Sequence, residues 1–322
     1  MDATAETKPG AWLGPALATA LYLALMTALA RASGMGFLLF PELGALASVV
    51  FADPAGRWAR SPLLLAVTPV LTAVPGVLIT RSLPYGPLAV ALDVGICLLV
   101  IQALRSPIVP ALSAGLLPLT LGITSWMYPW AIFAGTGGLA LLVVLRASLA
   151  PAVPTPPPPA ASPLRGPRRW AWIGPMAAFL AGALVLVQVL GSHLVLYPPL
   201  LVIAWEMLAD RDHCPWLGRP FTVLVVTGGA AVVGLALVQA LGVVPQASFL
   251  AVLATAWLLR LARLRCPPAF GLALLPFVIP SPPSTYPLLT LVGTAWLLLV
   301  VWLAQRLSQR RADRRGAREW KP

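Results

Sequence analysis

The nine residues PALSAGLLP at positions 110–118 return as PAFGLALLP at positions 268–276. The two stretches are identical at five positions and lie 158 residues apart. Other pairs repeat at or near this spacing, namely Tyr128-Pro129 with Tyr286-Pro287, Pro62 with Pro220, AWLGP at 11–15 with AWIGP at 171–175, Phe40-Pro41 with Tyr197-Pro198, and Asp53 with Asp210. Separate motifs that return in the same order at one spacing indicate an internal repeat. The sequence therefore predicts a tandem duplication.

Composition predicts that both copies lie in a membrane. The 322 residues are 59% hydrophobic and 10% charged, with a mean hydropathy of +0.87. Such a chain carries more apolar surface than one soluble core can bury. Apolar runs of about 20 residues, long enough to cross a bilayer, follow one another with Gly, Pro or Arg between them. Asp2 and Glu6 make the first residues unlike a cleaved signal peptide. We expect an all-α, polytopic membrane protein.

Each copy is expected to hold six apolar segments. In the first copy they cover residues 12–30, 37–51, 63–79, 87–104, 108–124 and 130–145. In the second copy they cover residues 172–190, 194–208, 221–241, 247–264, 267–279 and 287–303. Eight prolines in residues 151–167 predict an extended, water-exposed linker. The expected organisation is a tail (1–10), a first membrane repeat (11–146), a linker (147–170), a second membrane repeat (171–306) and a basic tail (307–322).

The positions of Lys and Arg predict the orientation in an inner membrane. If all segments cross and the N-terminus is cytoplasmic, only Arg31 and Arg81 of the 22 basic residues lie outside. Basic cytoplasmic loops are typical of membrane proteins, so both termini are expected in the cytoplasm. The two repeats then have the same orientation, about an axis along the membrane normal. The net charge of +12 lies on this side, and the seven basic residues in 306–321 predict contact with anionic lipid headgroups rather than nucleic acid.

The second and fifth segments of each repeat are short, begin near a proline and contain small residues. Short, proline-interrupted segments at matching places in two repeats are the best sequence indicator of a transporter binding site, because their helix ends leave backbone N–H groups unpaired. The alternative is an ordinary kinked helix whose small residues allow close helix packing. If these segments are re-entrant, the chain crosses the membrane eight times rather than twelve. Small residues in the first repeat include Gly44, Ala45, Ser48, Ser113, Ala114 and Gly115.

Two arginines precede the fifth segments at equivalent positions. Arg105 and Arg263 lie just ahead of the segments led by Pro110 and Pro268. A guanidinium group beside a helix N-terminus favours an anion, since both are positive. In the first repeat Ser106 and Ser113 add hydroxyl donors. The alternative is that both arginines only anchor the chain at the cytoplasmic surface.

Two acidic residues fall inside predicted membrane segments. Glu42 lies in the second segment and Asp93 near the middle of the fourth, and the aligned residues of the other repeat are Pro199 and Ala251. An ionisable group inside a bilayer is costly unless it is paired, hydrated or protonated. A carboxyl group that changes protonation there would couple proton movement to anion movement. Alternatively, Glu42 reaches the outer interface and Asp93 pairs with a polar neighbour.

No motif of a known catalytic or metal centre is present. The two histidines, His193 and His213, form no HxxH or HExxH pattern, and the three cysteines are irregularly spaced. No GxSxG motif and no glycine-rich phosphate loop with lysine occurs. We therefore expect no enzyme, no metal and no cofactor.

Two segments resemble the HPP family of integral membrane proteins. FPELGALASVVF at 40–51 is similar to that family's FPSLGASAV-type segment, and RCPPAFGLALLP at 265–276 is similar to its HPPAGATA signature. In this chain Cys266 replaces the signature histidine, and the first repeat has Ile108-Val109-Pro110 in place of the first three signature residues. The resemblance implies a helical membrane fold in each repeat, and some members of the family are linked to nitrite transport. It adds Cys266, Pro268 and Gly271 to the candidate substrate-binding residues.

The sequence predicts a transporter or channel for a small solute, with an inorganic anion such as nitrite as the first guess. The competing hypothesis is a membrane scaffold that does not transport and that recruits lipid or a cytoplasmic partner through its basic tail and linker. A transporter is expected to have a polar interior at Glu42, Asp93 and the proline-led segments. A scaffold is expected to be packed dry there.

Overall fold

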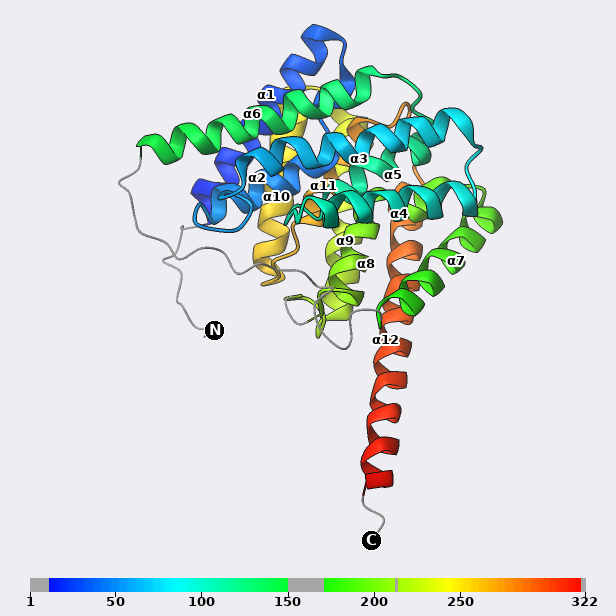
Figure 1. Cartoon of the computed structure of the whole chain (residues 1–322). Helices are drawn as coiled ribbons and strands as arrows, with labels where there is room; N and C mark the ends of the chain where they lie inside the picture. The colour runs from blue at the N-terminus through cyan, green and yellow to red at the C-terminus, as the bar shows by residue number, and fades with distance from the viewer. Residues whose placement is uncertain (1–11, 150–170, 212–213, 320–322) are drawn as a thin grey trace.

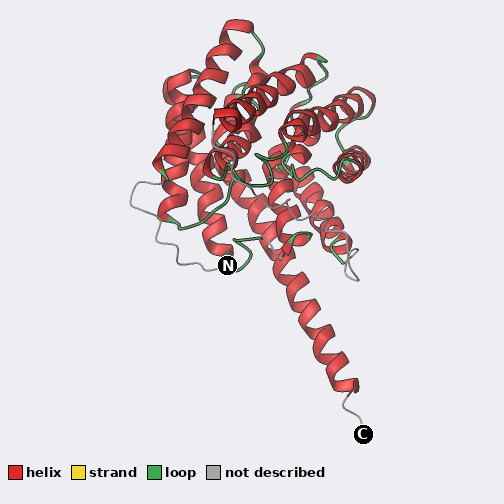
Figure 2. Ribbon diagram, turned by 60° about the vertical axis from the view of Figure 1, so that its left-hand side comes forward, coloured by secondary structure: helices red, strands yellow, loops and turns green. Residues whose placement is uncertain are grey.

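The chain folds as a bundle of α-helices. The computed structural model describes residues 12–149, 171–211 and 214–319, and these ranges contain twelve α-helices and no strand (Figure 2). The predicted linker at 151–167 and the N-terminal tail lie outside the described residues. The expected all-α fold is therefore confirmed.

The helices of the first half, with one 3₁₀ turn between them, are α1 (Leu13–Ser33), η1 (Gly36–Leu38), α2 (Pro41–Ala52), α3 (Pro62–Ser82), α4 (Pro87–Ala103), α5 (Ala111–Leu121) and α6 (Met127–Leu149). Those of the second half are α7 (Ile173–Leu190), η2 (His193–Leu196), α8 (Pro198–Leu208), α9 (Pro220–Leu241), α10 (Pro245–Leu261), α11 (Pro268–Leu274), η4 (Leu275–Phe277) and α12 (Tyr286–Glu319). The two halves thus follow the same order of α-helices.

Helix lengths divide the helices into two classes. Among the described residues, six helices are long and apolar enough to cross a membrane: α1, α3, α6, α7, α9 and α12. The second and fifth helices of each half are much shorter, with 12 and 11 residues for α2 and α5 and 11 and 7 for α8 and α11. The prediction of short second and fifth segments is confirmed. The fourth helices, α4 and α10, are also below spanning length at 17 residues each.

Proline sets the start of most helices. A proline occupies the first turn of α2, α3, α4, α8, α9, α10 and α11. Proline suits this place because its fixed φ is helical and its missing N–H has no partner within the helix in any case. The two fourth helices end in a matched way, since Arg105 and Arg263 follow them with left-handed φ values of 49° and 48°. This turn redirects the chain toward the fifth helix.

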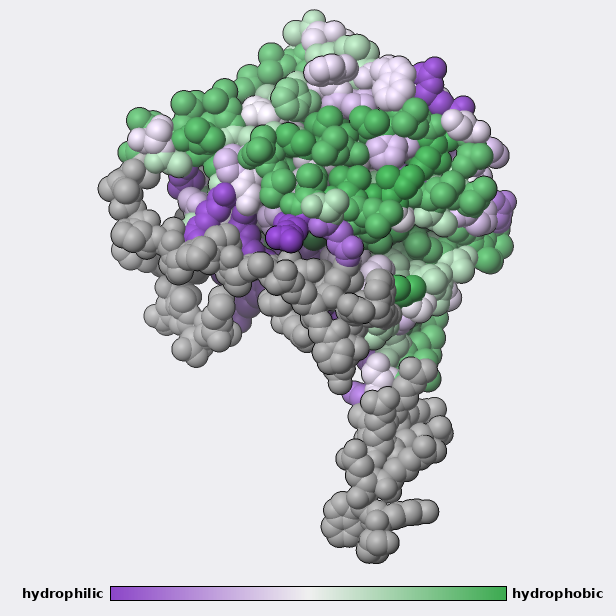
Figure 3. All heavy atoms as spheres, viewed as in Figure 1, coloured by the Kyte–Doolittle hydropathy of each residue, from purple (hydrophilic) through white to green (hydrophobic). Residues whose placement is uncertain are grey.

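The outer surface of the bundle is apolar, as a lipid-facing surface must be. On α1, the leucines Leu17, Leu21, Leu25 and Leu29 recur every fourth residue and are all exposed. Leu88 and Leu99 are likewise exposed on α4. Figure 3 shows hydrophobic residues covering most of the visible body, with hydrophilic residues gathered at its edges. A surface this apolar places the protein in a membrane.

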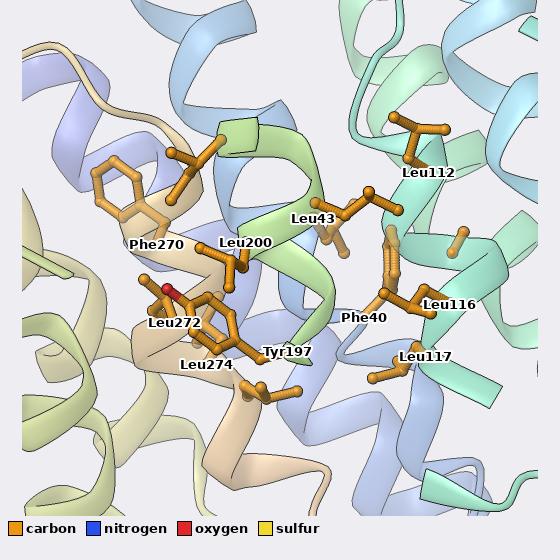
Figure 4. Close-up of a cluster of buried hydrophobic side chains, with 14 of the residues drawn as sticks. Phe40, Leu43, Leu112, Leu116, Leu117, Tyr197, Leu200, Phe270, Leu272 and Leu274 are labelled. Atoms are coloured by element: carbon orange, nitrogen blue, oxygen red, sulfur yellow. The ribbon is translucent and has the colours of Figure 1, made fainter. Parts of the chain in front are cut away.

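The two halves interlock through their short helices. Helix α5 of the first half packs on α8 of the second, and α11 of the second half packs on α2 of the first. Figure 4 shows the side chains of this crossing, drawn from all four helices and their entrances. Close approach depends on Gly44, where an added Cβ would lie 2.6 Å from Leu274 Cδ1. On the side of the bundle, α1 also packs along α10, where Thr27 donates a hydrogen bond to Ser248 Oγ at 2.8 Å.

Contacts that recur at the spacing of the repeat support the predicted duplication. The Tyr128 hydroxyl donates to the carbonyl of Ala114 at 2.8 Å, and the Tyr286 hydroxyl donates to that of Leu272 at 2.7 Å. In both pairs the residues are separated by 14 positions. A second matched contact joins the third and fifth helices, because Gly76 and Gly234 each lie against a backbone carbonyl of the fifth helix. The duplication itself remains our inference from these matches.

Contacts between helix ends support the same orientation for both halves. Arg31, in the last turn of α1, donates to the carbonyl of Val243, just after α9, at 3.1 Å. The ring of Tyr85, just after α3, stacks on His193, just after α7, with centroids 3.8 Å apart. The first contact joins the C-terminal end of α1 to that of α9, and the second joins the C-terminal end of α3 to that of α7. Within the first half, α1 and α3 end on the same side, because Phe37 packs against Tyr128 and Arg81 donates to the Thr124 carbonyl, both at or just before the start of α6. Given this, halves with opposite orientations would place the contacting ends on opposite sides of the bundle.

Three predicted boundaries are corrected by the structure. The segment 37–51 is not one helix, since η1 and an extended stretch precede α2. The fifth segment of the second half is not one α-helix over 267–279, because α11 ends at Leu274 and η4 follows. No break separates a basic tail at residue 307, because α12 continues to Glu319 and extends well beyond the body of the bundle (Figure 1). A run of residues with good helix propensity continues the last membrane helix past its apolar part.

The two matched tyrosines make a testable pair. Tyr128→Phe and Tyr286→Phe are each expected to lower stability by about 1 kcal/mol, because each leaves one buried carbonyl without its donor. The two losses should be similar if the sites are equivalent. Thermal unfolding of the detergent-solubilised protein measures both. Tyr85→Phe is the control, since its hydroxyl has no hydrogen-bond partner, and a control loss as large as the other two contradicts this interpretation.

Candidate functional site at the helix crossing

The second helix of each half begins inside the protein. The residues leading into α2, Leu38, Leu39 and Phe40, are 4%, 1% and 0% exposed. The residues leading into α8 are equally buried at Val195, Leu196 and Tyr197. The chain therefore enters the bundle ahead of each α-helix and starts that helix in the interior. Interrupted helices of this kind bring the positive end of a helix dipole into the core of a membrane protein.

Glu42 lies in the first turn of α2, at this interior start. Its side chain is 1% exposed, and neither carboxyl oxygen forms a hydrogen bond. The Ser113 hydroxyl of α5 faces the carboxyl group, yet Ser113 Oγ is also without a hydrogen-bond partner. The two groups are thus close enough to interact, but they form no hydrogen bond of normal geometry in this conformation. The hypothesis that Glu42 reaches the outer interface does not agree with its burial.

Two pairs of equivalent positions, one member of each pair from each half, meet at this point. Gly271 of α11 occupies the place in its repeat that Ser113 occupies in the other, and Pro199 of α8 corresponds to Glu42. A Cβ added to Gly271 would lie 3.1 Å from Pro199 Cγ and 3.6 Å from Glu42 Oε1. The first half therefore supplies the polar groups of the crossing, and the second half supplies small or apolar ones. We refer to Glu42, Ser113, Pro199 and Gly271 as the crossing site.

Asp93 lies on the other side of α5. Its side chain is fully buried, and Oδ1 accepts a weak hydrogen bond from Cys97 Sγ at 3.7 Å. Oδ2 has no partner. An added Cβ at Gly115 would lie 2.9 Å from Asp93 Oδ1, so the glycine of the α5 motif makes room for this carboxyl group. Asp93 thus does have a polar neighbour, but a thiol satisfies only one of its oxygens.

Three buried tyrosines add hydroxyl groups to this part of the interior. Tyr128 lies within electrostatic range of both Glu42 and Asp93, and Tyr286 lies within range of Glu42. Tyr197 shares a 2.6 Å hydrogen bond with Thr294, which in turn donates to Thr227 at 3.3 Å. The sequence-based candidates did not include these tyrosines. The signal that could have found them is the Tyr-Pro pair, which each of the three tyrosines begins.

The arginines of the predicted anion site lie apart from the crossing site. Arg105 and Arg263 are both exposed, several residues before their fifth helices begin. The Arg263 carbonyl accepts a hydrogen bond from Arg219 at 2.7 Å, which joins two loops at one end of the bundle. Ser106 is buried but is used structurally, since it bonds Thr68 at 2.8 Å and accepts from Ile108 N at 3.2 Å.

The remaining predicted residues line the start of the fifth helices. Pro110 is the residue before α5 and Pro268 is the first residue of α11, and both are buried. Cys266 is a free, fully buried cysteine just ahead of α11. Of the ten candidates, the structure brings Glu42, Ser113 and Gly271 together. It places Asp93 one helix away and the two arginines at the surface.

Few groups of the crossing site could bind a proton or a small solute. Within the described ranges no three His, Cys, Asp or Glu side chains come together as a metal site would require. The crossing site combines a carboxyl group, a hydroxyl group and the positive end of α2. Such groups can hold and release a proton, or donate hydrogen bonds to a small solute.

A groove of about 400 Å³ opens at one end of the bundle. Its lining includes Phe37, just ahead of α2, and Phe277, just after α11. The Phe37 ring packs edge-on against Tyr128, with centroids 5.3 Å apart. One lining residue of the groove, Phe37, therefore contacts a buried tyrosine that lies within electrostatic range of the two carboxyl groups.

Comparison with protein-family models, curated proteins and solved structures finds no match to this chain.

Proposed function

We propose that this membrane protein is a small-solute transporter and that its route passes through the crossing site. The observation that carries the proposal is the pair of fully buried carboxyl groups, Glu42 and Asp93, with three of their four oxygens unpartnered. A buried carboxyl group without partners costs a folded protein several kcal/mol or more. Groups of this kind inside a membrane protein usually mark an ion or substrate pathway.

The arrangement of the four short helices supports the same proposal. Helices α2 and α8 begin in the interior and meet α11 and α5 of the opposite halves. In transporters built from repeats, interrupted helices at the interface between the repeats hold the substrate. The groove at Phe37 supplies the outer approach, and the Phe37–Tyr128 pair acts as its gate. Rocking of one half against the other opens the crossing site to each side in turn.

A small inorganic anion, nitrite first, remains our proposal for the solute. A protonated carboxyl group and a serine hydroxyl both donate hydrogen bonds, and the start of α2 adds positive potential. Arg105 and Arg263 lie exposed at the surface, where they attract anions toward the protein rather than bind them. The resemblance to the HPP family is consistent with this solute.

A scaffold without transport activity is the second candidate. The observation that favours it is the tight packing of the crossing site, where Glu42 and Ser113 are 1% and 0% exposed. The long α12, which continues past its apolar part to Glu319, offers a partner a helical surface. The scaffold hypothesis does not explain why the two carboxyl groups are buried.

A flux assay in proteoliposomes decides between the two candidates. The purified chain should transport at least one of nitrite, nitrate, formate, chloride or bicarbonate faster than protein-free vesicles do. If the arginines attract anions, replacing both with Gln should slow uptake at low ionic strength and have little effect at high salt, where surface charge is screened. Unchanged uptake at low salt contradicts their role. No flux of any tested solute by folded protein contradicts transport of these anions and favours the scaffold.

A further inference from the structure

We propose that Glu42 is the proton-binding residue of this protein and that its protonation is coupled to solute movement. This inference rests on the proposed transport function and adds the coupling ion to it. It starts from geometry. Glu42 and Ser113 are both fully buried and face each other at the crossing of four short helices, and neither forms a hydrogen bond of normal geometry.

The surroundings of Glu42 can accommodate either protonation state. The neutral acid suits a site walled by Pro199 and Gly271, because an apolar environment disfavours charge. The carboxylate is favoured by the start of the α2 dipole, and the Ser113 hydroxyl and the backbone N–H of Glu42 lie near enough to donate to it when it is charged. A residue that is tolerated in both states can take up and release a proton. A carboxyl group locked in an ion pair could not.

The groups that face Glu42 from neighbouring helices do not neutralise it. Helix α5 presents Ser113, α6 presents Tyr128 and α12 presents Tyr286. Helices α8 and α11 present Pro199 and Gly271. On α1 the titratable side chain in the bundle core is Tyr22, whose hydroxyl donates to the Gly135 carbonyl. Three arginines with described side chains on α1, α6 and α12 are exposed, namely Arg31, Arg146 and Arg306. Asp93, on the other side of α5, is the second buried carboxyl group.

A proton fits this site better than a metal cation. A metal ion needs several oxygen, nitrogen or sulfur ligands, and the described part of the chain contains no cluster of three such side chains. A proton needs one carboxyl oxygen. In the proposed step a proton from water on one side forms an O–H bond with Glu42, and it returns to water when the site opens to the other side.

The first experiment detects the proton on Glu42 without requiring transport. Infrared titration of the lipid-reconstituted protein should show the C=O band of a protonated, buried carboxyl group that disappears as pH rises. Glu42→Gln should remove this band, whereas Asp93→Asn and Glu206→Gln should retain it. Glu206, on α8, is the matched control because it lies near the far end of the equivalent short helix. A titration of Glu42→Gln identical to that of the wild type overturns the proposal.

The second experiment separates coupling from transport. In proteoliposomes, a pH gradient should drive net nitrite uptake by the wild type, and Glu42→Gln should reduce this uptake to the level of empty vesicles. Exchange of labelled for unlabelled nitrite at equal pH should fall less than the gradient-driven uptake, since exchange needs no net proton movement and the glutamine amide still donates a hydrogen bond to the solute. Gradient-driven uptake by Glu42→Gln equal to that of the wild type overturns the coupling. Failure of the wild type to move any solute instead overturns the proposed function and leaves the infrared result standing.

Glu42→Asp provides a check if the glutamine variant does not fold. The shorter side chain keeps the carboxyl group and draws it away from Ser113. It should shift the infrared titration and weaken the gradient-driven uptake. Wild-type behaviour of this variant in both assays counts against Glu42 as the proton site.

Discussion

Replacing Gly76 with alanine is expected to lower the thermal midpoint of the detergent-solubilised protein by several degrees. A methyl group at this position would overlap the backbone carbonyl of Gly115 on α5, and a backbone carbonyl cannot rotate away as a side chain can. Overpacking typically costs about 1–3 kcal/mol, whereas the better helix propensity of alanine returns only about 1 kcal/mol. The steric cost therefore dominates. The same reasoning applies to Gly234, which lies against the carbonyl of Ala273.

Gly95→Ala is the matched control for both substitutions. Gly95 lies on α4, and an added Cβ there meets nothing within 4 Å. This variant should be as stable as the wild type or slightly more stable, because only the propensity effect remains. If Gly76→Ala and Gly234→Ala also leave the midpoint unchanged, the third and fifth helices do not pack as described. Loss at one site only counts against the equivalence of the two halves.

Much of the helical framework was predictable because its signals are local. Apolar runs of spanning length and prolines at helix starts do not depend on the rest of the fold. Pro62 and Pro220, matched in the sequence, are the first residues of α3 and α9. The short proline-led segments were also predictable.

The end of α12 and the break before α2 were missed for two different reasons. The basic run after Leu303 reads as a tail by charge, but its residues have adequate helix propensity and simply continue the preceding helix to Glu319. The stretch ahead of α2 is apolar enough to read as helix. It departs from the α-helix because Leu39 and Phe40 fill the core as the chain enters the bundle, which only tertiary packing can decide.

The candidate site was predicted in part. Glu42, Ser113 and Gly271 were all identified from sequence, but nothing local in the sequence indicates that α2 meets α5 and α11 at one point. Arg105 and Arg263 were expected beside helix starts because they are near in sequence. Both arginines are exposed, whereas Glu42 and Ser113 are buried, so the arginines are not part of the crossing site.

The second large effect concerns access to the crossing site. Ser113 is 0% exposed, so its position is closed to water in this conformation. A transporter must open the site to each side of the membrane during its cycle. Ser113→Cys, made with Cys97, Cys214 and Cys266 replaced by alanine or serine, introduces a thiol of nearly the same size. A membrane-impermeant maleimide should label this thiol, and the transported solute should change the labelling rate.

Ser248→Cys in the same background is the matched control. Ser248 is also 0% exposed, but it lies between α1 and α10, where Thr27 donates to it at 2.8 Å. The proposed route does not pass there, so this thiol should remain unlabelled under the same conditions. Labelling of both positions would indicate general loosening of the fold rather than a pathway.

The rate of maleimide labelling at position 113 in membrane-embedded protein is the most direct measurement of whether a route passes through the crossing site. The proposal predicts labelling of the Ser113→Cys variant from water while the Ser248→Cys variant stays unmodified. A folded Ser113→Cys variant that resists labelling from both sides of the membrane would contradict it, and the crossing of α2, α5, α8 and α11 would then be a packed core.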